Sequence, residues 1–125
     1  MITDVLSSSR FSDNAEPSRP ISILLVEDNE DALRALTRLL RLRGHNVIGV
    51  NTVAAALQAA DRSTFELIIS DLQLPDGDGV GLMHELVARR PIKGIAITGY
   101  GLPEDVHWAK EAGFQKYLLI FAKVM

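Results

Sequence analysis

The chain of 125 residues contains no cysteine, which excludes disulfides, thiolate metal sites and cysteine nucleophiles. It also lacks a basic N-terminal segment followed by an apolar one, and no apolar run approaches the roughly 18 residues that a membrane span requires. Lys and Arg total 13 against 16 Asp and Glu, so the formal net charge is −3 and offers no electrostatic attraction for nucleic acid. These absences predict a soluble cytoplasmic protein that binds neither nucleic acid nor membrane.

The composition is that of a single folded domain with a polar leader. Hydrophobic residues make up 47% of the chain and the mean hydropathy is +0.13, which is enough apolar material for one core. Residues 1–20 are instead rich in Ser, Asp, Asn and Pro, with too few apolar side chains to offset the entropy of ordering. We therefore expect a flexible N-terminal leader over 1–20 and one domain over 21–125.

Short apolar runs alternate with segments of helical periodicity along the domain. Residues 21–26 form an almost continuous apolar run, as in a strand covered on both faces, and residues 29–43 place Leu and Ala at helical spacing with Arg on the other side. The expected strands are 21–26, 47–50, 65–70, 92–98 and 116–120, and the expected helices are 29–43, 53–60, 79–89 and 103–112. This order predicts an α/β fold with a doubly wound, five-stranded parallel sheet of the flavodoxin-like type.

The sequence stops at Met125, soon after the fifth expected strand. No residues remain for a last helix to cover one flank of the sheet, so the domain is expected to be truncated after strand five. An uncovered flank exposes apolar surface, which predicts either a homodimer through that flank or low stability.

Acidic residues follow the ends of two expected strands. Glu27 and Asp28 come after the first strand, Asp71 after the third, and Thr98 ends the fourth. The carboxyl ends of parallel strands share one edge of the sheet, where ligands bind. Carboxylates meeting there repel one another unless a hard cation neutralises them, and oxygen ligands favour Mg²⁺. The pattern predicts a magnesium site in which one carboxylate is able to carry a phosphoryl group.

Other interpretations of these residues remain open at this point. Acids also favour the first turn of a helix through its macrodipole, and Asp71 or Thr98 alone fits an ordinary strand end or turn. The glycine-rich segment after Asp71 matches neither an EF-hand, nor a P-loop, nor a dinucleotide fingerprint. The remaining residues of interest are not expected to be catalytic: His45, His84 and His107 lie away from the strand ends, and Trp108 and Phe114 fit a core or helix face.

Four segments in order resemble the receiver domain of two-component response regulators: LLVEDNE at 24–30, LIISDLQLPDGDG at 67–79, IAITGYG at 95–101 and EAGF at 111–114. The resemblance spans residues 21–119, and the stretch from residue 94 is most similar to receivers of hybrid sensor histidine kinases. It implies a signalling phosphoacceptor, not an enzyme with a diffusible substrate. It also implies a sensor histidine kinase or a histidine phosphotransfer domain as partner, and Mg²⁺ as cofactor.

The resemblance further implies a role for individual residues. Asp71 matches the phosphoacceptor. Asp28 matches the direct Mg²⁺ ligand and Glu27 the ligand that acts through water. The remaining implied roles are the backbone carbonyl of Gln73 as a further Mg²⁺ ligand, Thr98 as the switch hydroxyl and Tyr117 as the switch aromatic.

The C-terminal end departs from the family pattern. The family places a lysine and a proline after the fifth strand, where this chain has Ile120 and Phe121; Lys123 substitutes only if the chain end folds back. Losing the cation that pairs with the phosphoryl group predicts a weaker link between phosphorylation and conformational change. The alternative is therefore a degenerate receiver that acts as a phosphorylation-independent interaction module. A small Mg²⁺-dependent phosphatase is disfavoured because Gln73 stands where an Asp-x-Asp pair would need a second acid.

Overall fold

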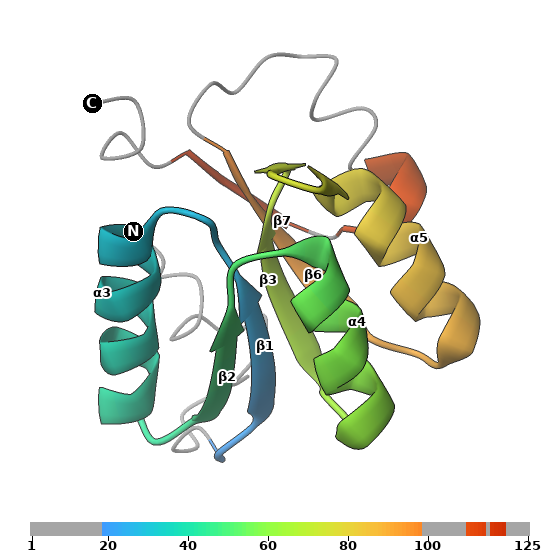
Figure 1. Ribbon diagram of the computed structural model, residues 1–125. Helices are drawn as coiled ribbons and strands as arrows, with labels where there is room; N and C mark the ends of the chain where they lie inside the picture. The colour runs from blue at the N-terminus through green and yellow to red at the C-terminus, as the bar shows by residue number, and fades with distance from the viewer. Residues whose placement is uncertain (1–18, 99–109, 115, 120–125) are drawn as a thin grey trace.

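The computed structural model describes residues 19–98, 110–114 and 116–119. Five parallel strands form one sheet in the order β2-β1-β3-β6-β7 (Figure 1). The strands are β1 (Ser22–Val26), β2 (Asn46–Val50), β3 (Leu67–Asp71), β6 (Lys93–Thr98) and β7 (Lys116–Leu119). The predicted α/β fold with a doubly wound parallel sheet is confirmed.

Helices cover both faces of the sheet. Helix α3 (Glu30–Leu42) lies on one side, and α4 (Val53–Arg62) and α5 (Gly79–Arg89) lie on the other (Figure 1). Strand side chains alternate between the faces, so β1 contributes to two buried clusters: Leu24 and Val26 pack toward α4 and α5, and Ile23 and Leu25 pack toward α3. Within the described residues, no helix is long and apolar enough to cross a bilayer.

Helix α3 shows how the local sequence sets an element's ends. The Asn29 side chain caps the start by accepting a hydrogen bond from the Ala32 amide at 2.9 Å. Gly44 follows the end with φ of +91°, a left-handed conformation that glycine adopts without a Cβ penalty, and its N–H donates to the Arg41 carbonyl at 2.9 Å. The helix therefore ends at Leu42, one residue before the expected end at 43.

Element ends differ from the expected ones by a few residues. Helix α4 runs two residues past the expected end at 60, and β3 begins at Leu67 and includes Asp71. Of the helix expected over 103–112, residues 110–112 are helical and the rest lies outside the described residues. The leader up to residue 18, Trp108, His107 and the C-terminal residues from Ile120 onward also lie outside them.

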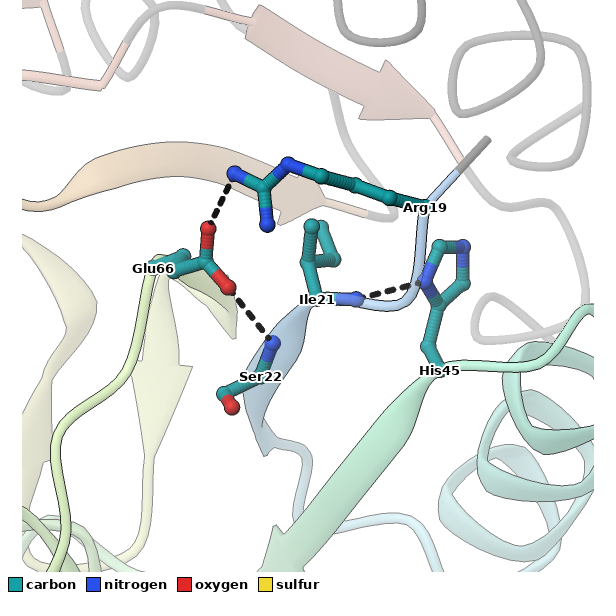
Figure 2. Close-up of polar contacts among 5 residues, drawn as sticks. All are labelled: Arg19, Ile21, Ser22, His45 and Glu66. Carbon is teal, nitrogen blue, oxygen red and sulfur yellow. Dashed lines mark hydrogen bonds and ion pairs between the residues drawn. The ribbon is translucent and has the colours of Figure 1, made fainter. Parts of the chain in front are cut away.

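The start of β1 is fixed at the end of the sheet opposite the acidic residues. Figure 2 shows Glu66 accepting hydrogen bonds from the Arg19 guanidinium at 2.7 Å and from the Ser22 amide at 3.3 Å. The Ile21 amide donates to Nδ1 of His45 at 3.3 Å, and His45 is 8% exposed (Figure 2). His45 therefore serves as a neutral structural acceptor, and it lies away from the strand ends as predicted.

This contact predicts a pH-dependent stability. Burial, and secondarily the nearby Arg43 charge, lower the pKa of His45 below 6.5. The unfolded chain therefore binds this proton more readily, so the contribution of His45 is complete above its unfolded pKa and is lost as pH falls through the folded value. We expect the free energy of unfolding, measured by urea denaturation, to fall as the pH is lowered from about 7.5 through the ordinary histidine pKa of about 6.5.

The matched variant is His45→Asn, because an asparagine oxygen can accept the Ile21 amide but does not titrate. We expect the variant to lose this part of the pH dependence. An equal fall in stability for wild type and variant over that range would assign the effect to other groups.

Candidate functional site

Three acidic side chains meet at the carboxyl ends of β1 and β3. Glu27 and Asp28 follow β1, Asp71 is the last residue of β3, and the two strands are paired with Val26 opposite Ser70. One carboxylate oxygen from each of the three lies within 4.8 Å of the others. The structure thus brings Asp71 next to two acids that precede it by more than 40 positions in the sequence.

Burial makes this cluster electrostatically costly on its own. Glu27 is 0% exposed and Asp71 is 4% exposed, whereas Asp28 is exposed to solvent. Carboxylates this close repel one another, and burial strengthens the repulsion at Glu27 and Asp71. Mg²⁺ takes oxygen ligands, usually one or two carboxylates together with waters, and the exposed Asp28 leaves one side of the cluster open to water. The residues present therefore fit a magnesium site.

Backbone contacts hold the two buried acids in place. The Glu27 amide donates to the Val50 carbonyl of β2 at 3.0 Å. The Ser70 hydroxyl donates to the Asp71 carbonyl at 2.8 Å in a buried setting. Asp71 also pairs in register with Ile97 of β6. The acidic cluster is consequently built on strand ends that are hydrogen-bonded to their neighbours in the sheet.

The glycine-rich segment after Asp71, where no strand was expected, is a small hairpin. Strands β4 (Gln73–Leu74) and β5 (Gly77–Asp78) pair antiparallel, with Gln73 opposite Asp78. The Gln73 amide donates to Oδ1 of Asp71 at 3.2 Å. This hydrogen bond orients the Asp71 carboxylate and places the Gln73 backbone beside the acidic cluster.

Gly79 lies where the first turn of α5 crosses the end of β3. A Cβ atom at this position would overlap the Asp71 carbonyl oxygen and would lie 3.1 Å from the Leu72 Cα. The Gly79 amide also donates to the Leu72 carbonyl at 2.9 Å. Sequence analysis placed this glycine only at the start of an expected helix, and the structure shows that the absence of a side chain leaves room for the Asp71 backbone.

Asp76, at the tip of the hairpin, caps a different helix. Its two carboxylate oxygens accept hydrogen bonds from the Val53 amide at 2.8 Å and the Ala54 amide at 3.0 Å. These bonds, that of Ala54 first, lower the pKa of Asp76. Thr52 satisfies the next amide, that of Ala55, at 3.0 Å.

Sequence analysis did not single out Asp76. The available signals were that α4 has no acidic residue in its own first turn, and that Asp76 stands between Pro75 and Gly77 in a turn sequence.

The two residues expected to act as a switch occupy neighbouring strands. Thr98 is the last residue of β6 and pairs with Leu119, while Tyr117 of β7 pairs with Ala96. Ile97, next to Thr98, pairs with Asp71, so the backbone at Thr98 reaches the edge that carries the acidic cluster. The switch roles of both side chains stay predictions.

The comparisons with known proteins agree on one family. The family model of the response regulator receiver domain matches residues 23–119. The chain is similar to the response regulator protein FleR of Pseudomonas aeruginosa, with 35% identity over 98 residues. The match covers 78% of this chain and 21% of FleR, so the chain spans about a fifth of the length of that relative.

Solved structures show the same fold with similar coverage. A CheY-like response regulator receiver domain protein from Methanospirillum hungatei JF-1 has a TM-score of 0.76 and 28% identity, covering 81% of this chain and 82% of that one. The receiver domain of a sensor histidine kinase from Pseudomonas aeruginosa PAO1, which holds a magnesium ion in its active-site cleft, has a TM-score of 0.71 and 31% identity, covering 85% and 92%. The chain therefore belongs to the response regulator receiver domain family, whose members serve as phosphoacceptors in signalling.

Proposed function

We propose that Asp71 accepts a phosphoryl group from the phosphohistidine of a sensor histidine kinase or a histidine phosphotransfer protein, in a Mg²⁺-dependent reaction of two-component signalling. The observation that carries this proposal is the convergence of Glu27, Asp28 and Asp71, with carboxylate oxygens within 4.8 Å of one another at the strand ends. The magnesium ion in the similar receiver from Pseudomonas aeruginosa supports the choice of metal.

In the proposed reaction an oxygen of the Asp71 carboxylate attacks the phosphorus atom. The new oxygen–phosphorus bond forms as the nitrogen–phosphorus bond breaks, and the imidazole nitrogen keeps the electron pair. The Gln73 amide, bonded to Oδ1 at 3.2 Å, keeps the carboxylate oriented.

Four groups of this chain would hold Mg²⁺. Asp28, Asp71 and the Gln73 backbone carbonyl would bind it directly, and Glu27 would bind it through water. When bound, the ion supplies positive charge that offsets the negative charge of the transferring group.

Phosphorylation would then act as a conformational switch. It adds close to two negative charges and three hydrogen-bond acceptors at Asp71. The Thr98 hydroxyl would turn toward the new phosphoryl oxygen and the Tyr117 side chain would follow, shifting the balance between two arrangements of the surrounding loops.

The second candidate function is a phosphorylation-independent interaction module. It is favoured by Ile120 and Phe121, which stand where the family pattern has a lysine and a proline. Without that lysine no cation is provided at that position to stabilise the added charge. The two functions differ in whether Asp71 is phosphorylated at all.

Acetyl phosphate distinguishes them, because it replaces the kinase with a small phosphoryl donor. We expect intact-mass measurement to show an adduct of about 80 Da when Mg²⁺ is present and none when a chelator removes it. Circular dichroism on the same sample shows whether the protein is folded. A folded sample that gains no adduct would contradict the phosphoacceptor proposal and leave the interaction module.

A further inference from the structure

The tip of the β4–β5 hairpin is tied to a helix that takes no other part in the site. Asp76 lies three residues after Gln73 and accepts hydrogen bonds from Val53 and Ala54 at the start of α4. We propose that Asp76 is a positioning residue: by anchoring the hairpin to α4 it holds the Gln73 backbone carbonyl in place for Mg²⁺. This inference rests on the proposed function.

The base of the hairpin is fixed independently of its tip. Leu72 and Leu74 are 6% and 9% exposed, so their side chains anchor the first strand in the core. Asp78 caps α5 by accepting from the Gly81 amide at 2.6 Å. Gln73 stands between the two buried leucines and pairs with Asp78 of β5, so its carbonyl direction depends on the geometry of the whole hairpin, whose tip Asp76 bonds to α4.

The helix to which the tip is bonded is itself held in the core. Helix α4 packs into the core through Ala56, which is 0% exposed. The Val53 side chain also lies against the hairpin, since a Cβ built on Gly77 would be 3.2 Å from its Cγ2 atom. Because α4 is packed on the sheet, the hydrogen bonds of Asp76 to α4 fix the position of the β4–β5 hairpin relative to the sheet.

A carboxylate suits this anchor better than any other short side chain. Two oxygens serve two consecutive amides at once, and the negative charge faces the positive end of a helix that has no acid in its own first turn. An asparagine at this position keeps one acceptor oxygen and loses the charge. Comparing Asp76→Asn with Asp76→Ala therefore distinguishes the effect of the hydrogen bonds and charge from the effect of side-chain size.

The test is a titration with Mg²⁺ alone, followed by amide chemical shifts, on wild type and variants of the full chain. We expect Asp76→Ala to raise the Mg²⁺ dissociation constant about tenfold, as removal of outer-shell partners commonly does, and Asp76→Asn to fall between. We also expect hydrogen exchange of the Gln73 amide to quicken in Asp76→Ala.

Thr52→Ala is the matched control. It removes a cap from the same turn of α4, the 3.0 Å bond to the Ala55 amide, but keeps the two hydrogen-bonding groups of Asp76. We expect Thr52→Ala to keep the wild-type affinity for Mg²⁺ and the wild-type exchange rate at Gln73.

The possible outcomes distinguish a failure of the positioning role of Asp76 from a failure of the proposed function. Equal losses of Mg²⁺ affinity in Asp76→Ala and Thr52→Ala would show that loosening α4 is enough, and would overturn the positioning role. Wild-type Mg²⁺ affinity in Asp76→Ala would overturn it too. A wild-type protein that binds no Mg²⁺ would overturn the proposed function, and the metal role of Asp76 with it.

Discussion

Asp71→Asn is expected to abolish phosphoryl uptake from acetyl phosphate, with no adduct in intact-mass measurement. The neutral amide is not a nucleophile toward phosphorus and does not form an acyl phosphate. The substitution preserves the shape of the side chain, and its oxygen can still accept the Gln73 amide that now donates to Oδ1 at 3.2 Å. The fold should therefore persist while the chemistry is lost.

The control for this variant is Asp31→Asn, which makes the same chemical change at another acid. Asp31 is exposed and lies in the first turn of α3, three residues after Asp28. We expect this control to form the full adduct. An adduct in Asp71→Asn equal to that of wild type would show that another residue accepts the phosphoryl group.

Gly79→Ala is expected to destabilise the domain by about 3 kcal/mol, at the upper end of the usual cost of overpacking. The added Cβ would overlap the Asp71 carbonyl oxygen and approach the Leu72 Cα to 3.1 Å. Both obstacles belong to the backbone, so no change of rotamer relieves them and the end of β3 must move. Urea denaturation measures the loss, and the adduct yield under folded conditions should also fall.

Gly81→Ala is the matched control two residues further along α5. Among the described residues outside the backbone of its own helix, a Cβ there meets only the Asp78 Oδ1 atom within 4 Å, at an ordinary 3.4 Å. Alanine favours a helix over glycine by about 0.8–1 kcal/mol, so this variant should be as stable as wild type or more so. Equal stability of the two variants would contradict the role assigned to Gly79.

The arrangement of the sheet followed from patterns that are local in the sequence. Continuous apolar runs such as that over 21–26 indicate strands covered on both faces, and parallel strands joined by helices leave few topologies. Strand ends were less predictable, because they depend on pairing partners. The apolar run of β3 stops before Asp71, yet Asp71 still pairs with Ile97.

The candidate site was likewise predictable from the sequence only in part. The convergence of Glu27, Asp28 and Asp71 was predictable, because all carboxyl ends of parallel strands share one edge. Asp76 and Gly79 escaped prediction because their significance lies in contacts across the fold. The amides that Asp76 caps lie 22 and 23 positions earlier in the chain, and the carbonyl that excludes a side chain at Gly79 belongs to Asp71.

The decisive measurement is identification of the phosphorylated residue itself. The wild-type protein is treated with acetyl phosphate and Mg²⁺ and reduced with borohydride, which converts an aspartyl phosphate to homoserine, and its peptides are then sequenced by mass spectrometry. The result predicted here is homoserine at position 71, dependent on Mg²⁺. Homoserine at a different acidic residue, or at none in a folded sample, would contradict the assignment of Asp71 as the phosphoacceptor.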